Sequence, residues 1–430
     1  AVVVTPVGKI TYNNKVYEFN NGEIGPITKK CKETLTGIQK QEIHDPFGWI
    51  YPITNWWKNK MFSVFKEIEV LNHEQVVFCN DKKAGLKAII ALHNTSNGPA
   101  FGGCRMWNYK SEYEALYDVL RLSRGMTYKA AVANIELGGG KAVIFGDSKK
   151  DKNKNLFRSF GRFIEGLAGR YITAEDVGTN VENMEWVRLE TSYVSGLSRS
   201  NGGSGDPSPV TALGTYAGIK ATVKKKLGKD SLSGMKIGIQ GVGNVGYHLC
   251  GYLKKEGAKL YVTDTDQRSL ERVSKDFRAN IINPEEIYSA DLDIFAPCAL
   301  GGILNNNTIP KLKCSIVAGA ANNQLENEDV HAQKLKERDI IYAPDYVINA
   351  GGLINCANEL NGYNRQKSLS QVRQSIYNNL LDVYKLSDED EVNTNKAAMK
   401  IAKQRIAKLV ELKDSLGPSK NKIKGENDKP

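Results

Sequence analysis

A chain of 430 residues is too long for one ordinary hydrophobic core, so we expect two domains. A composition of 41% hydrophobic and 25% charged residues is typical of a folded, globular protein. No apolar run approaches the roughly 18 residues that span a bilayer, and no signal-peptide core with a cleavage pattern is evident. The net charge of +11 comes mostly from lysines dispersed among acids, which favours a solvated basic surface over nucleic-acid binding.

Cysteine and histidine usage indicates a reduced, metal-free protein. The seven cysteines are scattered and contain no Cys-x-x-Cys pair, so we expect free thiols in a cytoplasmic protein rather than a disulfide framework. The five histidines are isolated from one another in the sequence, and we predict no metal site.

Residues 1–60 form an N-terminal extension for which the sequence predicts no role. Ile10–Tyr12 and Lys15–Tyr17 flank two asparagines and predict a small hairpin, after which polar, turn-rich stretches follow. An aromatic run from Phe47 to Trp57 is expected either to pack on the main body or to mark a small partner-binding element. Met61 is the first methionine, and we hypothesise that the catalytic protein begins there.

Residues 61–208 are predicted to form an α/β domain. Runs rich in β-formers predict strands at Val76–Cys79 and Leu86–Leu92, and Gly98–Gly103 predicts a loop with exposed backbone. A capping box beginning at Ser111 predicts a helix that delivers the chain to Gly125. The alternation of helix and strand continues with a helix over 156–167 and a strand over 171–173 that ends at Glu175 and Asp176.

Between these elements lies a glycine-bracketed stretch that carries two lysines, Lys129 and Lys141. Gly125 precedes the first lysine, and the triplet Gly138–Gly140 directly precedes the second. Missing side chains would let a ligand approach the backbone closely. Burial and a second ammonium disfavour the charged form, so one lysine could lose its proton near neutral pH while the other holds an anion. The alternative is a purely structural strand and turn; a phosphate loop is excluded because Ala142 follows Lys141.

Residues 209–348 are predicted to form a Rossmann-type dinucleotide-binding domain, after a hinge at Pro207–Pro209 and a helix over 210–227. A buried strand over 235–240 runs into a Gly-x-Gly-x-x-Gly turn, and the next strand, over 259–263, ends at Asp264. Bare amides at the following helix N-terminus would receive a pyrophosphate, and Asp264 would accept hydrogen bonds from a ribose. A tight turn without a ligand is the alternative. The turn consists of Gly241, Val242, Gly243, Asn244, Val245 and Gly246.

The remaining elements complete a doubly wound sheet. Short strands are expected over 292–296, 315–318 and 340–342, and the loops 297–301 and 319–323 should face the cofactor. Residues 349–417 are expected to be helical, mainly over 366–386 and 395–416. The polar residues 418–430 are expected to form a disordered tail.

Six motifs occur in the order found in one enzyme family, namely GMTYK, LGGGKAVI, ITAEDVG, PSPVTA, GVGNVG and YAPDYVINAGG. Over roughly residues 61 to 415 the chain resembles the glutamate/leucine/phenylalanine/valine dehydrogenases, in particular the leucine dehydrogenase branch. The resemblance implies helices that return to the first domain and leave a cleft between the two domains. It also implies a homo-oligomer that binds NAD, an amino acid or 2-oxo acid, and ammonia, with no nucleic-acid or membrane partner.

The resemblance also implies a role for individual residues. Lys129 would bind the substrate carboxylate, and Lys141 would activate water against the imine. Asp176 would exchange protons with the amino group, although an Asp that only caps the following turn is an alternative. Asn323 would help to hold substrate or nicotinamide, with Asn322 as its rival on the cofactor side. The walls of the side-chain pocket would be Phe101, Gly102, Ala174, Leu353 and Cys356.

These walls predict an aliphatic substrate. Glutamate dehydrogenases carry a lysine where this chain has Phe101 and a hydroxyl residue where it has Cys356, so a second carboxylate would be buried here without a partner. Leucine dehydrogenases carry a smaller aliphatic residue at Phe101 and valines at Leu353 and Cys356, so the pocket keeps its apolar character with an altered shape. We predict NAD-dependent, reversible oxidative deamination of leucine, isoleucine and valine. The alternatives are a phenylalanine- or tryptophan-type dehydrogenase and a non-catalytic nucleotide-binding relative.

Overall fold

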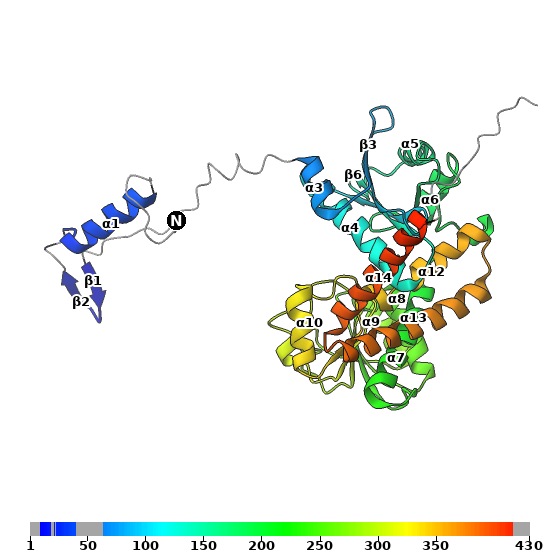
Figure 1. Cartoon of the computed structure of the whole chain (residues 1–430). Helices are drawn as coiled ribbons and strands as arrows, with labels where there is room; N and C mark the ends of the chain where they lie inside the picture. Colours follow the sequence, from blue (N-terminus) through cyan, green and yellow to red (C-terminus); the bar gives the residue numbers. More distant parts are fainter. Residues whose placement is uncertain (1–8, 19–20, 22, 40–62, 416–430) are drawn as a thin grey trace, which may run out of the picture. The chain divides into compact units, whose positions relative to one another are not determined.

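The computed structural model describes residues 9–18, 21, 23–39 and 63–415, and the chain divides into two compact units, Ala1–Val64 and Phe65–Pro430 (Figure 1). Three sequence-based expectations lie outside the described residues. They concern the aromatic run before residue 60, the start at Met61 and the tail after residue 417.

The first unit contains the predicted hairpin. Strands β1 (Lys9–Tyr12) and β2 (Lys15–Glu18) pair antiparallel. The two asparagines between them have φ values of 47° and 59°, as a two-residue hairpin turn requires. The stretch expected to be rich in turns instead contains helix α1 (Pro26–Gln39), because its apolar residues recur at helical spacing.

Helix α3 (Val64–Leu71) begins at the last residue of the first unit, and the second unit continues with a mixed five-stranded sheet in the order β3-β4-β6-β5-β7. The pairs β3/β4 and β4/β6 are antiparallel, whereas β5 pairs in parallel with both β6 and β7. Helix α4 packs against β4 and β6, and the helices α5 and α6 pack together on the other face of the sheet. The elements are β3 (Gln75–Asp81), β4 (Leu86–Asn94), β5 (Ala100–Trp107), α4 (Glu112–Ala133), β6 (Gly138–Phe145), α5 (Lys154–Glu165), β7 (Tyr171–Glu175) and α6 (Val181–Arg188).

Two predictions about this sheet were wrong, and both misread glycine as a break in secondary structure. The expected loop at Gly98–Gly103 is largely the start of β5, where Gly102 and Gly103 leave room for neighbouring backbone. The helix that Ser111 caps does not end near Gly125 but continues to Ala133. Gly125 is exposed within that helix and costs only about 1 kcal/mol relative to alanine, which tertiary packing overrides.

The other sheet is parallel, with six strands in the order β10-β9-β8-β11-β12-β13. Numbered from β8, this is the 3-2-1-4-5-6 order of the doubly wound dinucleotide-binding fold. The predicted α/β fold class is confirmed. The elements are α7 (Ser208–Leu227), β8 (Lys236–Gln240), α8 (Asn244–Lys255), β9 (Lys259–Thr263), α9 (Gln267–Phe277), β10 (Asn280–Ile281), β11 (Ile294–Pro297), β12 (Ile316–Val317), α10 (Glu328–Glu337) and β13 (Ile341–Tyr342).

Within the described residues, four α-helices follow the parallel sheet, and they tie the two sheets together. They are α11 (Asp345–Ile348), α12 (Gly351–Ala357), α13 (Arg365–Glu389) and α14 (Thr394–Ser415). Helix α13 packs on α7, and α14 packs on α4. Arg405 of α14 donates to the carbonyl oxygens of Ala131 and Val132 at 3.1 and 2.6 Å, and so binds the last turn of α4. The chain thus returns to the first sheet.

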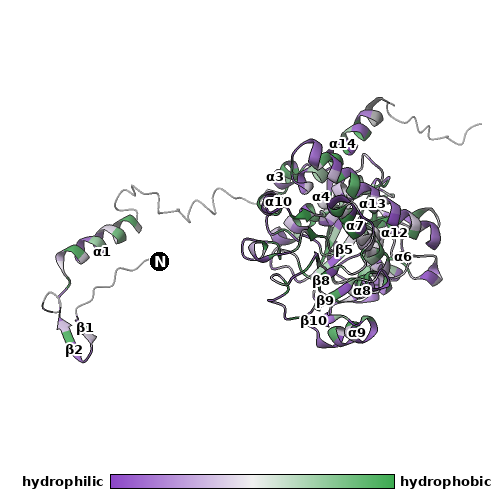
Figure 2. Ribbon diagram, turned by 90° about the horizontal axis from the view of Figure 1, so that it is seen from below, coloured by the Kyte–Doolittle hydropathy of each residue, from purple (hydrophilic) through white to green (hydrophobic). Residues whose placement is uncertain are grey.

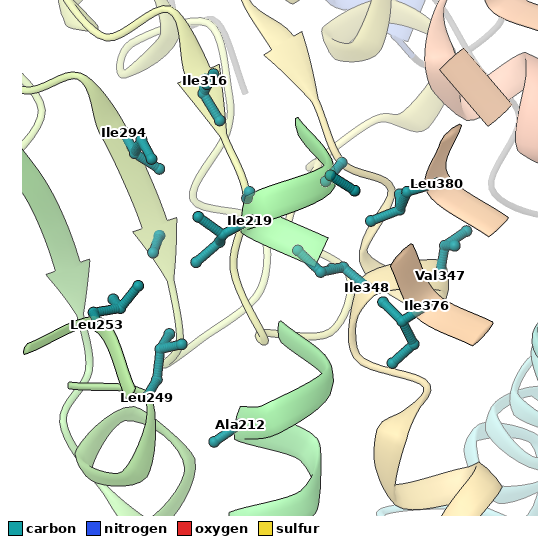
Figure 3. Close-up of a cluster of buried hydrophobic side chains, with 14 of the residues drawn as sticks. Ala212, Ile219, Leu249, Leu253, Ile294, Ile316, Val347, Ile348, Ile376 and Leu380 are labelled. Carbon is teal, nitrogen blue, oxygen red and sulfur yellow. The ribbon is translucent and has the colours of Figure 1, made fainter. Parts of the chain in front are cut away.

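A large buried core connects the parallel sheet with the C-terminal helices. Hydrophobic residues gather on inner elements, whereas outer helices such as α9 are largely hydrophilic (Figure 2). Gly214 and Gly218 of α7 allow close packing, since a Cβ there would lie 2.4 Å from side-chain atoms of Ile376 and Ile348. Figure 3 shows α7 between the two layers, with Ile219 placed between Ile294 and Ile316 of the sheet and Ile348, Ile376 and Leu380 of the helices.

Two buried histidines next to α4 make the stability of the fold depend on pH. His73 Nε2 lies 2.8 Å from Ser123 Oγ, His93 Nδ1 lies 2.7 Å from Thr127 Oγ1, and the two ring centroids are 4.7 Å apart. Burial lowers the pKa of His73 to about 4 and, with the neighbouring His73, that of His93 to about 3. Below the ordinary pKa of about 6.5, the unfolded chain therefore binds protons that the folded chain excludes.

We expect the free energy of unfolding to fall as the pH falls from about 6.5 toward 4, with each histidine contributing about 2 kcal/mol between pH 7 and pH 5. Denaturant unfolding of the wild type and of His93→Gln at both pH values isolates this contribution, because all other titrating groups are shared. The wild type should lose about 2 kcal/mol more than the variant. An equal loss in both proteins would contradict the assignment.

Candidate active site

Two residues predicted from separate motifs, Lys141 and Asp176, are in direct contact. Lys141 lies on β6 and is only 4% exposed, and Asp176 immediately follows β7. The Lys141 Nζ lies 3.0 Å from Asp176 Oδ1. Side chains alternate along a strand, so Lys141 shares a face of β6 with Gly139, which abuts Thr127 of α4. The lysine therefore points toward the helix that carries Lys129.

Lys129 lies in α4, partly buried and within the electrostatic reach of this pair. The pKa of Lys129 is lowered to about 8, chiefly because the side chain is buried; the charge of Lys141 acts in the same direction, and Asp345 and Asp176 oppose both effects. In the glycine-bracketed stretch, the charged form of Lys129 is therefore destabilised near neutral pH. A bound anion would add to the counter-charge of Asp345 and Asp176 and so favour the ammonium form.

The glycine triplet is buried and allows close packing of neighbouring elements. A Cβ on Gly138 would lie 2.1 Å from the Asn94 carbonyl oxygen, and one on Gly140 would lie 2.8 Å from the ring of Tyr171. A Cβ on Gly139 would lie 2.2 Å from the backbone nitrogen of Thr127. These glycines allow α4 to approach β6 and so bring Lys129 and Lys141 to one site.

Asp176 has a second cationic partner, Arg105 of β5, which sequence reasoning missed. Arg105 Nε donates to Asp176 Oδ2 at 3.0 Å, and its Nη1 donates to Asp118 Oδ2 at 2.9 Å. Burial opposes ionisation of Asp176, but Lys141 and Arg105 outweigh it and hold the pKa of that carboxyl below its usual range. An arginine within an otherwise apolar strand was the available signal.

The predicted side-chain walls form one buried apolar cluster. Phe101 of β5 is opposite Gly139 of β6, and Ala174 of β7 is opposite Gly103. Leu353 and Cys356 of α12 complete the set. A Cβ on Gly102 would lie 1.8 Å from the Gly140 carbonyl oxygen, so Gly102 serves strand packing. The cluster also contains Ala130, Leu137, Ile172 and Ala357, with Met126, Ile135, Tyr193 and Leu360 packed against it.

The glycine-rich turn of the parallel sheet has the geometry of a dinucleotide site. Gly241 has a φ of 97°, and a Cβ on Gly246 would lie 2.1 Å from the Gly241 carbonyl oxygen. Gly243 precedes α8 and has open space around its Cβ position, with Asn244 and Val245 in the first turn of the helix. Val242 N donates to Asp264 Oδ2 at 2.7 Å. These residues fit a pyrophosphate at the turn and a ribose at the acid.

The loop after β12 carries the two predicted asparagines, both exposed. Asn349 Nδ2 donates to Asn322 Oδ1 at 2.7 Å, and Asn323 adopts a φ of 51°. Sequence reasoning missed Asp345, which fixes this loop by accepting from Gln324 N at 3.0 Å. Burial raises the pKa of Asp345, and its charge acts on Lys129. Asp345 thus holds the loop after β12 by a hydrogen bond and also acts on Lys129 of α4 through its charge.

The two sheets place a lysine-bearing α/β domain next to a doubly wound domain whose glycine-rich turn fits a dinucleotide, as expected of an α/β dehydrogenase. Two family models match the chain, the Glu/Leu/Phe/Val dehydrogenase dimerisation domain over residues 73–193 and the glutamate/leucine/phenylalanine/valine dehydrogenase domain over residues 258–413. The chain belongs to this family and is an amino-acid dehydrogenase, an oxidoreductase, as its motifs predicted.

Individual relatives are similar over almost their whole length. A leucine dehydrogenase of Geobacillus stearothermophilus is 55% identical over 344 residues, which are 80% of this chain and 93% of the relative. An L-tryptophan dehydrogenase of Nostoc punctiforme is 50% identical over 343 residues, 80% of this chain and 96% of the relative. The crystal structure of L-tryptophan dehydrogenase from Nostoc punctiforme has a TM-score of 0.72 and 48% identity, covering 81% of this chain and all of that one.

Two further properties concern the described part of the chain. Within it, no helix is long and apolar enough to cross a membrane. Among the same residues, no group of three or more histidine, cysteine or acidic side chains is arranged to hold a metal ion.

Proposed function

We propose that the chain catalyses the NAD-dependent, reversible oxidative deamination of the branched-chain amino acids leucine, isoleucine and valine to 2-oxo acids and ammonia. The observation that carries the proposal is the apolar cluster of Phe101, Ala174, Leu353 and Cys356 on the strands and helix next to the Lys141–Asp176 pair. Burial of an aliphatic side chain is worth about 1.5–3 kcal/mol. The distal carboxylate of glutamate would lose its hydration against these walls without gaining a partner.

Three charged residues of the site each have a different role in the proposed reaction. Lys129 binds the substrate carboxylate, which supplies the counter-charge that its buried position favours. Asp176, kept ionised by its two cations, accepts a proton from the substrate ammonium and returns one to the departing amine. Lys141 activates the water that attacks the imine carbon and stabilises the carbinolamine. A bound nicotinamide supplies the hydride acceptor for the substrate Cα.

Asp264 supports NAD as the cofactor. Its carboxylate lies at the end of β9 beside the glycine-rich turn, where it can accept from ribose hydroxyls and repel a 2′-phosphate. Asn323 and Asn322 belong to the loop that we assign to the nicotinamide end of the site, with Asn323 on the substrate side.

We expect kcat/KM with NAD to exceed that with NADP by about tenfold or more, since about 1.4 kcal/mol of repulsion gives that ratio. Asp264→Asn should narrow the ratio, because it removes the charge that repels the phosphate. Asp266→Asn is the matched control, as it removes an exposed acid two residues further along and retains a helix-capping side chain. Equal kcat/KM values with both cofactors in the wild type would refute the assignment.

Aromatic L-amino acids are the second candidate substrate class. The L-tryptophan dehydrogenase relative is nearly as similar to this chain as the leucine dehydrogenase relative, at 50% against 55% identity. A Phe101 ring can narrow the pocket toward valine or stack on an aromatic substrate.

The proposal extends to assembly and compartment. A homo-oligomer is supported by the match of residues 73–193 to the family's dimerisation domain. A cytoplasmic location is supported by the free cysteines of the described residues. Its partners would be the amino acid, the 2-oxo acid, ammonia and NAD.

The test of the proposed function is NAD reduction, followed by absorbance, with a panel of L-amino acids and the wild-type chain. Leucine, isoleucine and valine should each reduce NAD and yield ammonia in equal amount, and the reverse reaction should require ammonia. A folded wild-type protein that reduces NAD with none of the amino acids would overturn the proposal.

A further inference from the structure

A line of four charged side chains links the elements that build the site. Lys141 on β6 contacts one oxygen of Asp176, and Arg105 on β5 contacts the other at 3.0 Å. The same guanidinium reaches Asp118 of α4 at 2.9 Å. The line ends on α4, the helix that also carries Lys129, and its four side chains are each at most 24% exposed.

The guanidinium of Arg105 has a second carboxylate partner, Asp118, which it contacts through a different nitrogen. Asp118 Oδ2 accepts from Tyr109 Oη at 2.8 Å as well as from Arg105. Arg121 approaches the other oxygen of Asp118 at 3.5 Å from a more exposed position. A planar guanidinium that uses two different nitrogens for two carboxylates has a fixed orientation, which a single ammonium group cannot reproduce.

The backbone at this point leaves Asp176 little freedom. A Cβ on Gly103, two residues before Arg105, would lie 2.9 Å from the Cβ of Asp176 and 2.4 Å from the Glu175 carbonyl oxygen. The strand that carries Arg105 therefore lies directly against the residue that it contacts. The other charged groups that act on Asp176 come from β6, α4 and β7, namely Lys141, Lys129 and Glu175.

We propose that Arg105 is a positioning residue for Asp176: it holds one carboxylate oxygen so that the other stays directed at Lys141 and at the reacting amine. The inference rests on the proposed function, because it concerns the acid of that reaction. A proton-transfer group acts only within hydrogen-bond reach of its partner, and loss of orientation should lower kcat while substrate still binds.

Two substitutions separate position from charge. Arg105→Gln removes both the positive charge and the guanidinium that orients Asp176. We expect kcat for leucine to fall on the order of tenfold to a hundredfold, less than the 10²–10⁴ that acid–base catalysis as a whole contributes. KM should change less than about threefold. The acidic limb of the kcat/KM profile should move up by about one pH unit, because Asp176 loses a cation. Arg105→Lys keeps the charge, so its limb should move less while kcat stays low.

The matched control is Arg121→Gln, which removes an arginine from the same Asp118 without touching Asp176. Its kcat and pH profile should equal those of the wild type. Asp118→Ala is a second test in case the Arg105 variants fold poorly. It keeps Arg105 but removes the carboxylate that orients its guanidinium, so kcat should again fall while KM is retained. Denaturant unfolding of every variant identifies losses that come from stability alone.

Wild-type activity is measured first, so failure of the proposed function appears as an inactive wild type. With an active wild type, the inference is overturned if Arg105→Gln keeps the wild-type kcat and acidic limb. It is also overturned if Arg121→Gln causes the same loss of kcat as Arg105→Gln. A lowered kcat with a shifted limb in Arg105→Gln alone supports it.

Discussion

Lys141→Ala is expected to lower kcat for leucine by about a thousandfold or more. The substitution removes the group that we assign to water activation and to stabilisation of the carbinolamine, and each of these contributions is worth on the order of 10² or more. NAD affinity should change little, since the glycine-rich turn and Asp264 belong to the parallel sheet. Steady-state kinetics and NAD titration of the folded variant measure both quantities.

Two other lysines provide the comparison. Lys129→Ala should chiefly raise the KM for the amino acid, because its proposed role is to bind the carboxylate. Lys87→Ala removes an exposed lysine from β4, which pairs with β6, and should leave kcat and KM unchanged. Turnover close to that of the wild type in folded Lys141→Ala would remove this lysine from the mechanism.

Gly139→Ala is expected to cost at least about 2 kcal/mol of unfolding free energy, at the upper part of the range for overpacking in a core. The added Cβ would lie 2.0 Å from Thr127 Oγ1 and 2.2 Å from Thr127 N, and the backbone atom cannot move without displacing α4. A displaced α4 moves Lys129 relative to Lys141, and a shift of about 1 Å can cost about a hundredfold in rate. Denaturant unfolding and kcat/KM for leucine measure the two effects.

Gly125→Ala is the matched control within the same motif region. This glycine is exposed within α4, and a Cβ there would meet no atom within 4 Å. Alanine is the better helix former by about 1 kcal/mol, so the variant should be as stable as the wild type or more stable, with normal activity. If Gly139→Ala behaved like Gly125→Ala, the packing role of the glycine triplet would be wrong.

The parallel sheet was predictable from the sequence almost in full. Its central strands are buried on both faces and appear in the sequence as short apolar runs. The glycines of the turn at Gly241–Gly246 occur at the spacing of a strand–turn–helix motif, which marks the end of β8 and the start of α8. The acid at the end of the next strand followed from the same geometry, and Asp264 indeed contacts the turn.

The first sheet was less predictable, because its glycines serve contacts between distant segments. Gly102 and Gly103 lie within β5, where their backbone meets Gly140 and Glu175, and no local pattern distinguishes such a glycine from one in a turn. Gly125 was also misread as a break in secondary structure, although α4 is stabilised by its buried face and continues past this glycine.

The site residues that belong to sequence motifs were predictable, whereas those that are defined only by tertiary contacts were not. The motifs placed Lys141 and Asp176 together, and their ion pair agrees with that placement. The contact between Arg105 and Asp176 joins residues 71 apart in the sequence, and an arginine on a buried strand has no periodic signature that names its partner. Asp345 was missed for the same reason, since its partners lie on a loop and on α4.

The measurement that tests the proposed function most directly is kcat/KM with NAD for leucine, valine, phenylalanine, tryptophan and glutamate, determined side by side. The apolar walls around Phe101 predict that leucine or valine leads, and that glutamate falls at least about a hundredfold behind, because an unpaired buried carboxylate costs several kcal/mol. A clear lead for phenylalanine or tryptophan would overturn the aliphatic assignment, and a lead for glutamate would contradict the pocket itself.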